Sequence, residues 1–400
     1  MILYLFIFVL AFLVSCLSSK LAKKYMSSKG RNKNKYKFLY ILSFIVVYLI
    51  FTIPSAIRYD IGTDYSYTYL PMLNEMKRTG YVPDTDLIIK FFFILINKFS
   101  LPNQTFFALT SMVMNLFFLL AIYQDKTFNY PLGIFVFFMN CIFFSSWSNI
   151  RQMMGIAFAI FGFALMQNKR NKESKAICFL MVVLSFFCHK SCLAFIPIYI
   201  VLLIKWKNKY LSLFALLVIA LTPVLTPVAR NIITSFGYGY FFGGYTVSGT
   251  GLGNLLIVLP SIVLFLYSFY SVLIKEEKLF FNVLITSAIS ICIFLFCFII
   301  KNTELFLRLY HLLYAFDMIY LPLLVESKKK HFKFKEEVSK LNLNINPYAY
   351  IKSDNNIICC INDISFFFYF SFIIGSYLIS FVFQEIFNTF FGITKFQTFF

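Results

Sequence analysis

Apolar segments follow one another along almost the whole chain and are separated by short polar stretches. Runs of about twenty apolar residues are long enough to cross the hydrocarbon layer of a bilayer as helices. The segments predicted to do so are 2–19, 38–57, 105–123, 131–147, 152–167, 176–188, 191–204, 210–227, 255–274, 279–300, 309–325 and 363–383. The ten-residue alternation that is typical of a membrane barrel is absent. The pattern therefore predicts an all-α, polytopic transmembrane helix bundle with about 12 spans.

Residues 87–99 form a further apolar segment, which is shorter than a span and carries Lys90 and Lys98. Counting it as a span would invert the orientation of every later loop. We therefore expect an interfacial or re-entrant helix that lies over the bundle. The segments 176–188 and 191–204 are also short, so they form either two short spans or one long tilted helix.

The distribution of lysine and arginine predicts which loops are cytoplasmic. Residues 20–37 contain eight basic residues and no acidic one. Because basic residues accumulate in cytoplasmic loops, this loop is predicted to lie inside and the N-terminus outside. Alternation along the chain then places inside the basic segments 169–175, 205–209, 275–278 and 327–335. The loops 58–86 and 237–254 fall on the extracytoplasmic side.

The chain divides into three predicted parts. Residues 1–326 form a membrane-embedded core, 327–362 a cytoplasmic basic hydrophilic insert, and 363–400 a final transmembrane helix with a short tail. Within the core, the loop 237–254 holds seven of the 15 glycines and three tyrosines. It is either a flexible connector or a mobile lid whose tyrosine rings stack on sugar faces.

The composition excludes a soluble domain and several classes of function. The chain is 60% hydrophobic and only 13% charged, whereas soluble domains are roughly half apolar and a quarter charged. Its net charge of +19 is explained by the cytoplasmic loops, and no nucleic-acid-binding motif accompanies it, so no nucleic-acid partner is expected. The nine cysteines show no metal-ligand spacing with histidine, and no Walker motif or dinucleotide fingerprint is present. We therefore expect neither a metal nor a cofactor.

Ionisable residues nevertheless gather at the predicted outer boundary of the membrane, on four separate segments. They are Arg58, Asp60, Asp64, Arg151, His189, Lys190 and Arg308. Any one of them could be a snorkelling anchor or half of a structural ion pair. Charges at membrane depth are costly, however, and basic groups that converge on one face favour a binding site. Three arginine forks suit a phosphate or diphosphate, while one histidine and two aspartates supply candidate proton acceptors.

The most specific motif is the run RYDIGTDYSYTY at residues 58–69, directly after an apolar span. With Ile-Arg-Gln at 150–152, His-Lys-Ser at 189–191 and Leu-Arg-Leu-Tyr at 307–310, it resembles the EpsG family of bacterial exopolysaccharide polymerases, relatives of Wzy-type polymerases. The order and spacing of these motifs match over residues 38–325, whereas the hydrophilic insert departs from the family pattern.

The resemblance implies a membrane glycosyltransferase that polymerises undecaprenyl-diphosphate-linked oligosaccharide repeat units for a capsule or exopolysaccharide. Its place would be the bacterial cytoplasmic membrane, with the active site facing outside, in contact with membrane lipid. A flippase and a chain-length regulator are the protein partners that this pathway suggests.

The same resemblance implies roles for the motif residues. His189 is the leading general base, with Asp64 and then Asp60 as further catalytic candidates. Arg151 and Arg308 would bind the donor diphosphate, and Gly62 would allow a turn that brings Arg58 and Asp64 to one cavity. The expected substrate-binding residues are Arg58, Gly62, Thr63, Tyr65, Tyr69, Arg151, Gln152, Lys190, Arg308 and Tyr310.

Tyr65, Tyr67 and Tyr69 alternate along the motif. An extended segment would direct all three to one side as a platform for sugars, whereas a helix would scatter them. We therefore expect an extended conformation here. The competing interpretation is an ordinary interfacial belt, in which tyrosine is common.

Two other functions use the same donor. A flippase for the lipid-linked saccharide needs charges through the depth of the membrane, and their clustering at one face favours an enzyme. A polysaccharide ligase would have the same donor site, and the sequence does not identify the acceptor. A purely structural membrane protein is disfavoured by the clustered arginine, histidine and aspartate residues.

Overall fold

The computed structural model describes residues 2–62, 64–169, 171–203, 210–235, 239, 252–275, 278–326 and 371–382. The longer helices are α1 (Ile2–Ser27), α2 (Gly30–Ile57), α5 (Gln104–Tyr123), α8 (Ile150–Lys169), α9 (Lys172–Cys188), α11 (Tyr210–Ile233), α12 (Leu252–Lys275) and α13 (Lys278–Ile299). The shorter ones are η1 (Tyr65–Tyr69), α3 (Leu70–Thr79), α4 (Leu87–Lys98), α6 (Tyr130–Met139), α7 (Ile142–Ser148), η2 (Lys190–Ala194), α10 (Phe195–Leu203) and α14 (Thr303–Tyr314). A last helix covers Ser371–Val382. No strand occurs in these ranges.

The predicted all-α, polytopic bundle is confirmed. Within the described ranges, eight helices are long and apolar enough to cross a membrane, or nine if the bent pair α6 and α7 forms one span. The apolar helices Lys190–Leu203 and Ser371–Val382 are shorter than this. The number of about 12 spans therefore stays a prediction.

The segment 131–147 is not the continuous helix that its apolar pattern predicted. It is broken into α6 and α7, which are bent by 47°, and Cys141 at the break has a left-handed φ of 53°. The Asn140 side chain donates from Nδ2 to the carbonyl of Tyr314, at 3.1 Å. Both halves stay apolar, so the pattern alone did not reveal the break.

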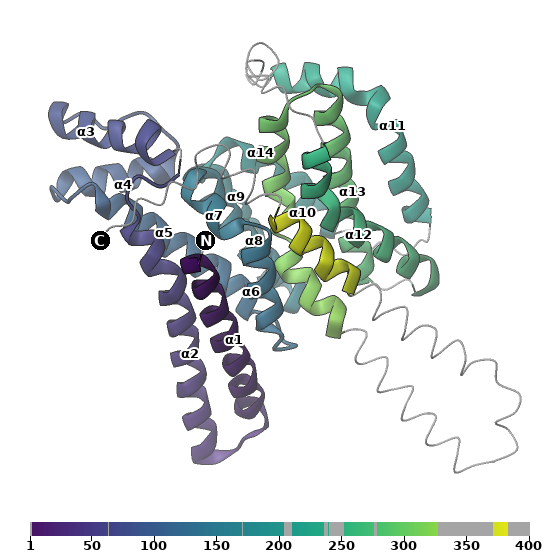
Figure 1. Cartoon of the computed structure of the whole chain (residues 1–400), viewed down its shortest axis with the longest axis horizontal. Coiled ribbons are helices and arrows are strands. Elements are labelled where there is room, and N and C mark those ends of the chain that lie inside the picture. Colours follow the sequence, from purple (N-terminus) through teal and green to yellow (C-terminus); the bar gives the residue numbers. More distant parts are fainter. Residues whose placement is uncertain are drawn as a thin grey trace, which may run out of the picture.

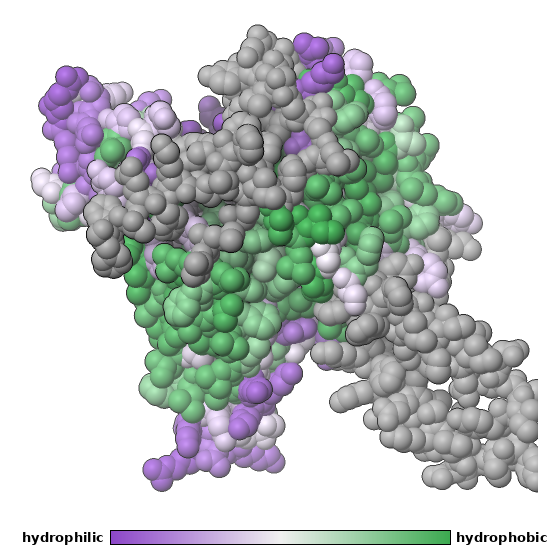
Figure 2. Space-filling view, in the orientation of Figure 1, coloured by the Kyte–Doolittle hydropathy of each residue, from purple (hydrophilic) through white to green (hydrophobic). Residues whose placement is uncertain are grey.

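The direction of the helices defines two ends of the bundle. α1 and α2 form an antiparallel pair joined by a tight turn (Figure 1). At the far end of α2, Nε2 of Gln104 donates to the carbonyl of Ala56, at 2.6 Å. At the other end of α5, the Tyr123 hydroxyl donates to Ser18 of α1, at 3.0 Å. Figure 2 shows an apolar surface between the hydrophilic α1–α2 turn and the hydrophilic region of α3 at the opposite end.

The short apolar segment predicted at 87–99 forms α4, with 12 residues. It packs against α3, α5 and α9, and α3 and α4 project together from one end of the bundle (Figure 1). A helix of this length rises about 18 Å, well short of a bilayer core of about 30 Å. Its interfacial or re-entrant placement remains the expectation.

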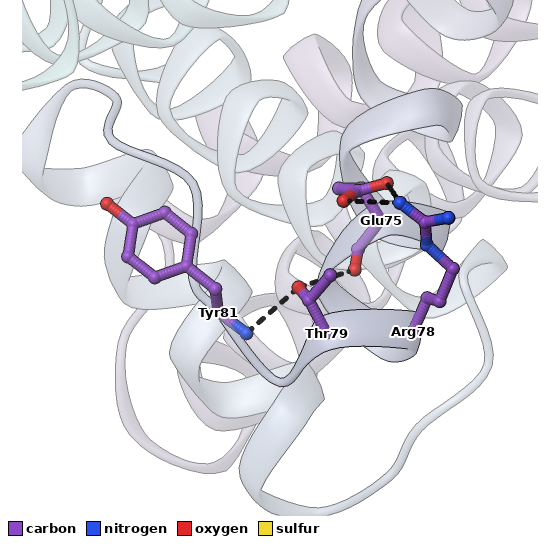
Figure 3. A network of polar contacts seen from close by, with 4 residues as sticks. All are labelled: Glu75, Arg78, Thr79 and Tyr81. Atoms are coloured by element: carbon purple, nitrogen blue, oxygen red, sulfur yellow. Dashed lines mark hydrogen bonds and ion pairs between the residues drawn. The ribbon is translucent and has the colours of Figure 1, made fainter.

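The exposed end of α3 is closed by local polar contacts (Figure 3). Arg78 pairs with Glu75 at 2.9 Å, and the Thr79 hydroxyl donates to the Glu75 carbonyl at 2.8 Å. The backbone amide of Tyr81 then donates to the Thr79 hydroxyl. Gly80, with φ of 74°, takes the left-handed position that ends the helix. These contacts turn the chain from α3 toward α4.

Two glycines let α9 pack closely on α8. A Cβ at Gly155 would lie 2.8 Å from the carbonyl oxygen of Ser185, and one at Gly162 would lie 3.0 Å from Cα of Cys178. Only glycine fits such an approach of one backbone to another. The C-terminal end of α9 therefore lies beside the N-terminal end of α8.

Two sequence predictions lie outside the described residues. The insert 327–362 lies outside them entirely, and of the loop 237–254 only Gly239 and residues 252–254 are described. After the insert, the helix Ser371–Val382 packs on the core, where the Tyr377 hydroxyl donates to Oδ2 of Asp317 at 2.8 Å.

Candidate active site

Arg58 follows the last residue of α2 and is only 2% exposed. Its Nη1 donates to the Ser55 carbonyl at 3.3 Å and to the Ser111 hydroxyl at 3.2 Å. The guanidinium carbon lies 5.5 Å from the ring centre of Phe107 and 5.9 Å from that of Trp147. Within the described part of the chain, Nε and Nη2 have no hydrogen-bond partner. Burial lowers the pKa of Arg58 to about 9, so the group remains mostly charged at neutral pH.

Gly62 makes the turn that the sequence predicted. Its φ is 90°, and the amide of Tyr65 donates to its carbonyl at 3.0 Å. A Cβ at this position would lie 2.5 Å from the carbonyl oxygen of Trp147. The turn therefore needs glycine both for its backbone conformation and for the space beside α7.

Two further motif residues, Asp60 and Thr63, were predicted to belong to the site. Thr63 lies outside the described residues. Asp60 is exposed, has a left-handed φ of 51°, and accepts a hydrogen bond from the Ser66 hydroxyl. Asp60 thus contacts a residue of η1 in the same motif.

Asp64 lies among basic side chains from four segments of the chain. Burial raises the pKa of Asp64, and the nearby basic side chains of Arg151, Arg308, His189 and Arg58 oppose this, in that order. These residues stand at the start of α8, in α14, at the end of α9 and at the end of α2. The structure thus brings together the cations that the sequence placed on one face.

Asp86 joins this cluster, and the sequence reasoning missed it. Its Oδ2 lies 3.3 Å from Nη1 of Arg151 and 3.4 Å from Nδ1 of His189. In the sequence, Asp86 is only the last residue of the predicted extracytoplasmic loop 58–86. The available signal was an acidic residue directly before the apolar segment 87–99.

Gln152 and Tyr310 support the cluster from within the bundle. Gln152 is buried, and its Nε2 donates to the backbone carbonyl of Arg308 at 2.5 Å. This bond ties the start of α8 to α14. The buried Tyr310 hydroxyl lies 3.2 Å from Ser261 and donates to the carbonyl of Ile257, also at 3.2 Å, so it faces α12.

Lys190 and Arg308 are the remaining basic residues of the predicted site. Lys190 opens η2 directly after His189 and is exposed. Arg308 is half-buried and lies close enough to Asp64 to lower the pKa of that carboxyl.

The predicted extended tyrosine platform is wrong. Residues 65–69 form the π-helix η1, in which Tyr65 and Tyr69 are 2% and 1% exposed while Tyr67 is 85% exposed. The Tyr65 ring stacks on Phe107 with ring centres 4.1 Å apart, and its hydroxyl donates to Gln104. Residues four positions apart share a helix face, so burial of two rings on α5 favours the helix over the extended form.

Tyr69 instead lies beside a site cation. Burial raises the pKa of its hydroxyl, and the positive charge of Arg151 opposes that shift. The hydroxyl makes no hydrogen bond of standard geometry with the described residues.

Among the residues that the structure describes, no three His, Cys, Asp or Glu side chains gather closely enough to hold a metal ion.

Fold and site together define a multi-pass α-helical membrane protein with a cationic site at one end of its bundle. The chain matches the EpsG family over residues 40–335 and belongs to that family, which confirms the resemblance drawn from the motifs. The matched range contains every segment of the site. Neither a curated protein nor a solved structure matches the chain significantly. Membership indicates an exopolysaccharide polymerase family.

Proposed function

We propose that this protein polymerises undecaprenyl-diphosphate-linked oligosaccharide repeat units at the outer face of the bacterial cytoplasmic membrane, for a capsule or exopolysaccharide. The proposal is supported by a cluster of charged side chains at one end of the bundle. Arg151 and His189 meet at Oδ2 of Asp86, at 3.3 and 3.4 Å, and Asp64 interacts electrostatically with Arg151, Arg308, His189 and Arg58. This cluster lies at the end of the bundle opposite the basic α1–α2 turn. Because basic loops stay in the cytoplasm, the cluster faces outside.

In this proposal Arg151 and Arg308 bind the donor diphosphate. A guanidinium presents a planar fork that matches two phosphate oxygens. Asp64 interacts with the same cations, so an incoming diphosphate competes with its carboxylate and frees it to orient the acceptor hydroxyl. The sequence predicted that Arg58 also binds the donor. Because its side chain is only 2% exposed, we propose instead that it adds positive charge without touching the donor.

His189 is the general base for the transfer. The acceptor hydroxyl gives its proton to His189 as its oxygen attacks the anomeric carbon of the donor sugar. The bond from that carbon to the diphosphate oxygen breaks, and the electron pair leaves with undecaprenyl diphosphate. Arg151 and Arg308 stabilise the negative charge that develops on the leaving group, which is usually the largest electrostatic contribution to such catalysis.

The interior of the bundle argues against a flippase. Asp317 is a buried ionisable residue inside the span Leu305–Glu326. It accepts hydrogen bonds from Tyr377 at 2.8 Å and from Asn140 at 3.5 Å. An acidic residue at this depth would oppose the passage of a diphosphate, whereas the cations lie at the outer end.

Deletion of the gene in its native host is expected to abolish the polymer and to leave single lipid-linked repeat units in the outer leaflet. Mass spectrometry of extracted lipids would identify the units, and oxidation by membrane-impermeant periodate in protoplasts would place them outside. Units protected from periodate would indicate a flippase instead. Full-length polymer that stays on its lipid would indicate a ligase.

A further inference from the structure

The carboxylate of Asp86 contacts two basic side chains of the site, Arg151 and His189. It stands immediately before α4, yet makes no hydrogen bond that caps this helix. Its Oδ2 lies 3.3 Å from Nη1 of Arg151 and 3.4 Å from Nδ1 of His189. The side chain is only 11% exposed. Arg151 of α8 and His189 at the end of α9 thus contact the same oxygen atom of the residue that precedes α4.

The contact with Asp86 determines which ring nitrogen of His189 carries the proton. A carboxylate oxygen can only accept a hydrogen bond, so Nδ1 of His189 must donate. In a neutral imidazole, a proton on Nδ1 leaves the lone pair free on Nε2. Within the described part of the chain, Nε2 makes no hydrogen bond. Nε2 of His189 is therefore the ring nitrogen that can accept a proton.

The backbone of His189 is fixed as well. Its amide donates to the carbonyl of Ser185 at 3.2 Å, and its carbonyl accepts from the amide of Cys192 at 2.9 Å. The residue itself is extended, between the end of α9 and the start of η2. The backbone of His189 is thus held by α9 and η2, and Asp86 is the partner that holds the ring.

We propose that Asp86 is the positioning residue of this active site, which holds His189 in the tautomer that receives the proton of the acceptor hydroxyl on Nε2. The proposal rests on the function proposed above. The proton moves from the hydroxyl to Nε2, the oxygen bonds to the anomeric carbon, and the diphosphate leaves with its electron pair. Asp86 then stabilises the imidazolium, and Arg151 holds the same carboxylate oxygen in place.

The nearby Asp84 supplies a matched control. It is two residues earlier, its side chain is 86% exposed, and it pairs with Lys90 at 3.1 Å. Exposed pairs of this kind contribute little to stability. Asp84→Asn and Asp86→Asn make the same chemical change in the same loop, but only the second removes a partner of His189.

The test uses the full-length protein in nanodiscs and lipid-linked repeat units extracted from the deletion strain. Asp86→Asn is expected to lower the rate of elongation at saturating donor about 100-fold, because the amide can fix the wrong tautomer. Asp84→Asn is expected to elongate at the wild-type rate. Asp86→Glu, which keeps a carboxylate, should recover a measurable part of the rate.

A double-mutant cycle separates a positioning role from a merely structural one. In a His189→Ala background, Asp86→Asn should cost less than about threefold, because the residue through which it acts is gone. In an Asp84→Asn background, where the first substitution touches neither His189 nor Arg151, it should keep its full effect. Thermal unfolding of each variant checks that the protein is folded.

The outcomes distinguish this proposal from the proposed function. A wild-type protein that elongates, together with an Asp86→Asn variant as fast as Asp84→Asn, would overturn the role of Asp86 alone. Equal losses from Asp86→Asn with and without His189 would do the same, because the effect would then not pass through the imidazole. A wild-type protein that does not elongate the units would overturn the proposed function and this inference with it.

Discussion

Arg151→Lys is expected to lower the rate of polymer elongation about 100-fold although it keeps the positive charge. Arg151 holds Asp86 through Nη1 at 3.3 Å and lies beside Asp64 and Tyr69. A lysine ammonium is a point charge on a flexible stem, so it cannot hold this carboxylate and grip two phosphate oxygens at once. The measurement is the elongation rate of purified protein on extracted lipid-linked repeat units.

Arg78→Lys is the matched control for this substitution. Arg78 lies in α3, and its ion pair with Glu75 is largely exposed, with side-chain exposures of 76% and 54%. The same loss of a fork at this position should leave elongation unchanged. Near-wild-type elongation by Arg151→Lys would mean that a simple positive charge is sufficient, and the diphosphate clamp would be abandoned.

Gly62→Ala is expected to remove most of the folded protein, whereas Gly80→Ala is expected to be mild. Both glycines have positive φ, 90° and 74° respectively, and this conformation costs an alanine about 1–2 kcal/mol. At Gly62 the added methyl would also lie 2.5 Å from the carbonyl oxygen of Trp147, while at Gly80 nothing lies within 4 Å. The overlap should add roughly 2–3 kcal/mol.

The yield of monodisperse protein and the midpoint of thermal unfolding measure this difference. If the two alanine variants behave alike, the close contact between the motif loop and α7 is not required for folding. A lower yield for Gly62→Ala alone would show that the contact with Trp147 holds the loop in place.

The convergence of the cations was predictable because it follows from topology. Alternating spans place the ends of segments 38–57, 152–167 and 176–188 at defined sides of the membrane. Arg58, Arg151 and His189 must then meet at one end if the bundle closes. The depth of each residue was not predictable, because it depends on side-chain packing. Arg58 is enclosed by Phe107 and Trp147, which come from other helices.

Asp86 shows the limit of reasoning from charge and spacing. Its partners Arg151 and His189 lie 65 and 103 residues away in the sequence. They meet only because α4 packs on α9 and because two glycines draw α9 onto α8. An acidic residue before a short apolar segment does not reveal such contacts.

The prediction of an extended conformation for residues 65–69 was wrong for a different reason. Alternation of Tyr65, Tyr67 and Tyr69 is compatible with an extended strand, but the same spacing places the first and last rings on one face of a helix. Their burial against Phe107 and Phe106 of α5 decides between the two. The break between α6 and α7 at Cys141 was missed for a similar reason. Apolar residues continue on both sides of Cys141, so the pattern fits a continuous helix as well as a broken one.

In the proposed function, Arg151 and Arg308, which lie near Asp64, bind the diphosphate of a lipid-linked saccharide. Native mass spectrometry of the purified protein with undecaprenyl diphosphate and with undecaprenyl monophosphate tests it most directly. We expect the diphosphate to bind at least about tenfold more tightly than the monophosphate, a difference of about 1.4 kcal/mol. This preference should disappear in Arg151→Ala and in Arg308→Ala. Equal affinity of the wild-type protein for both lipids, unchanged by either substitution, would contradict it.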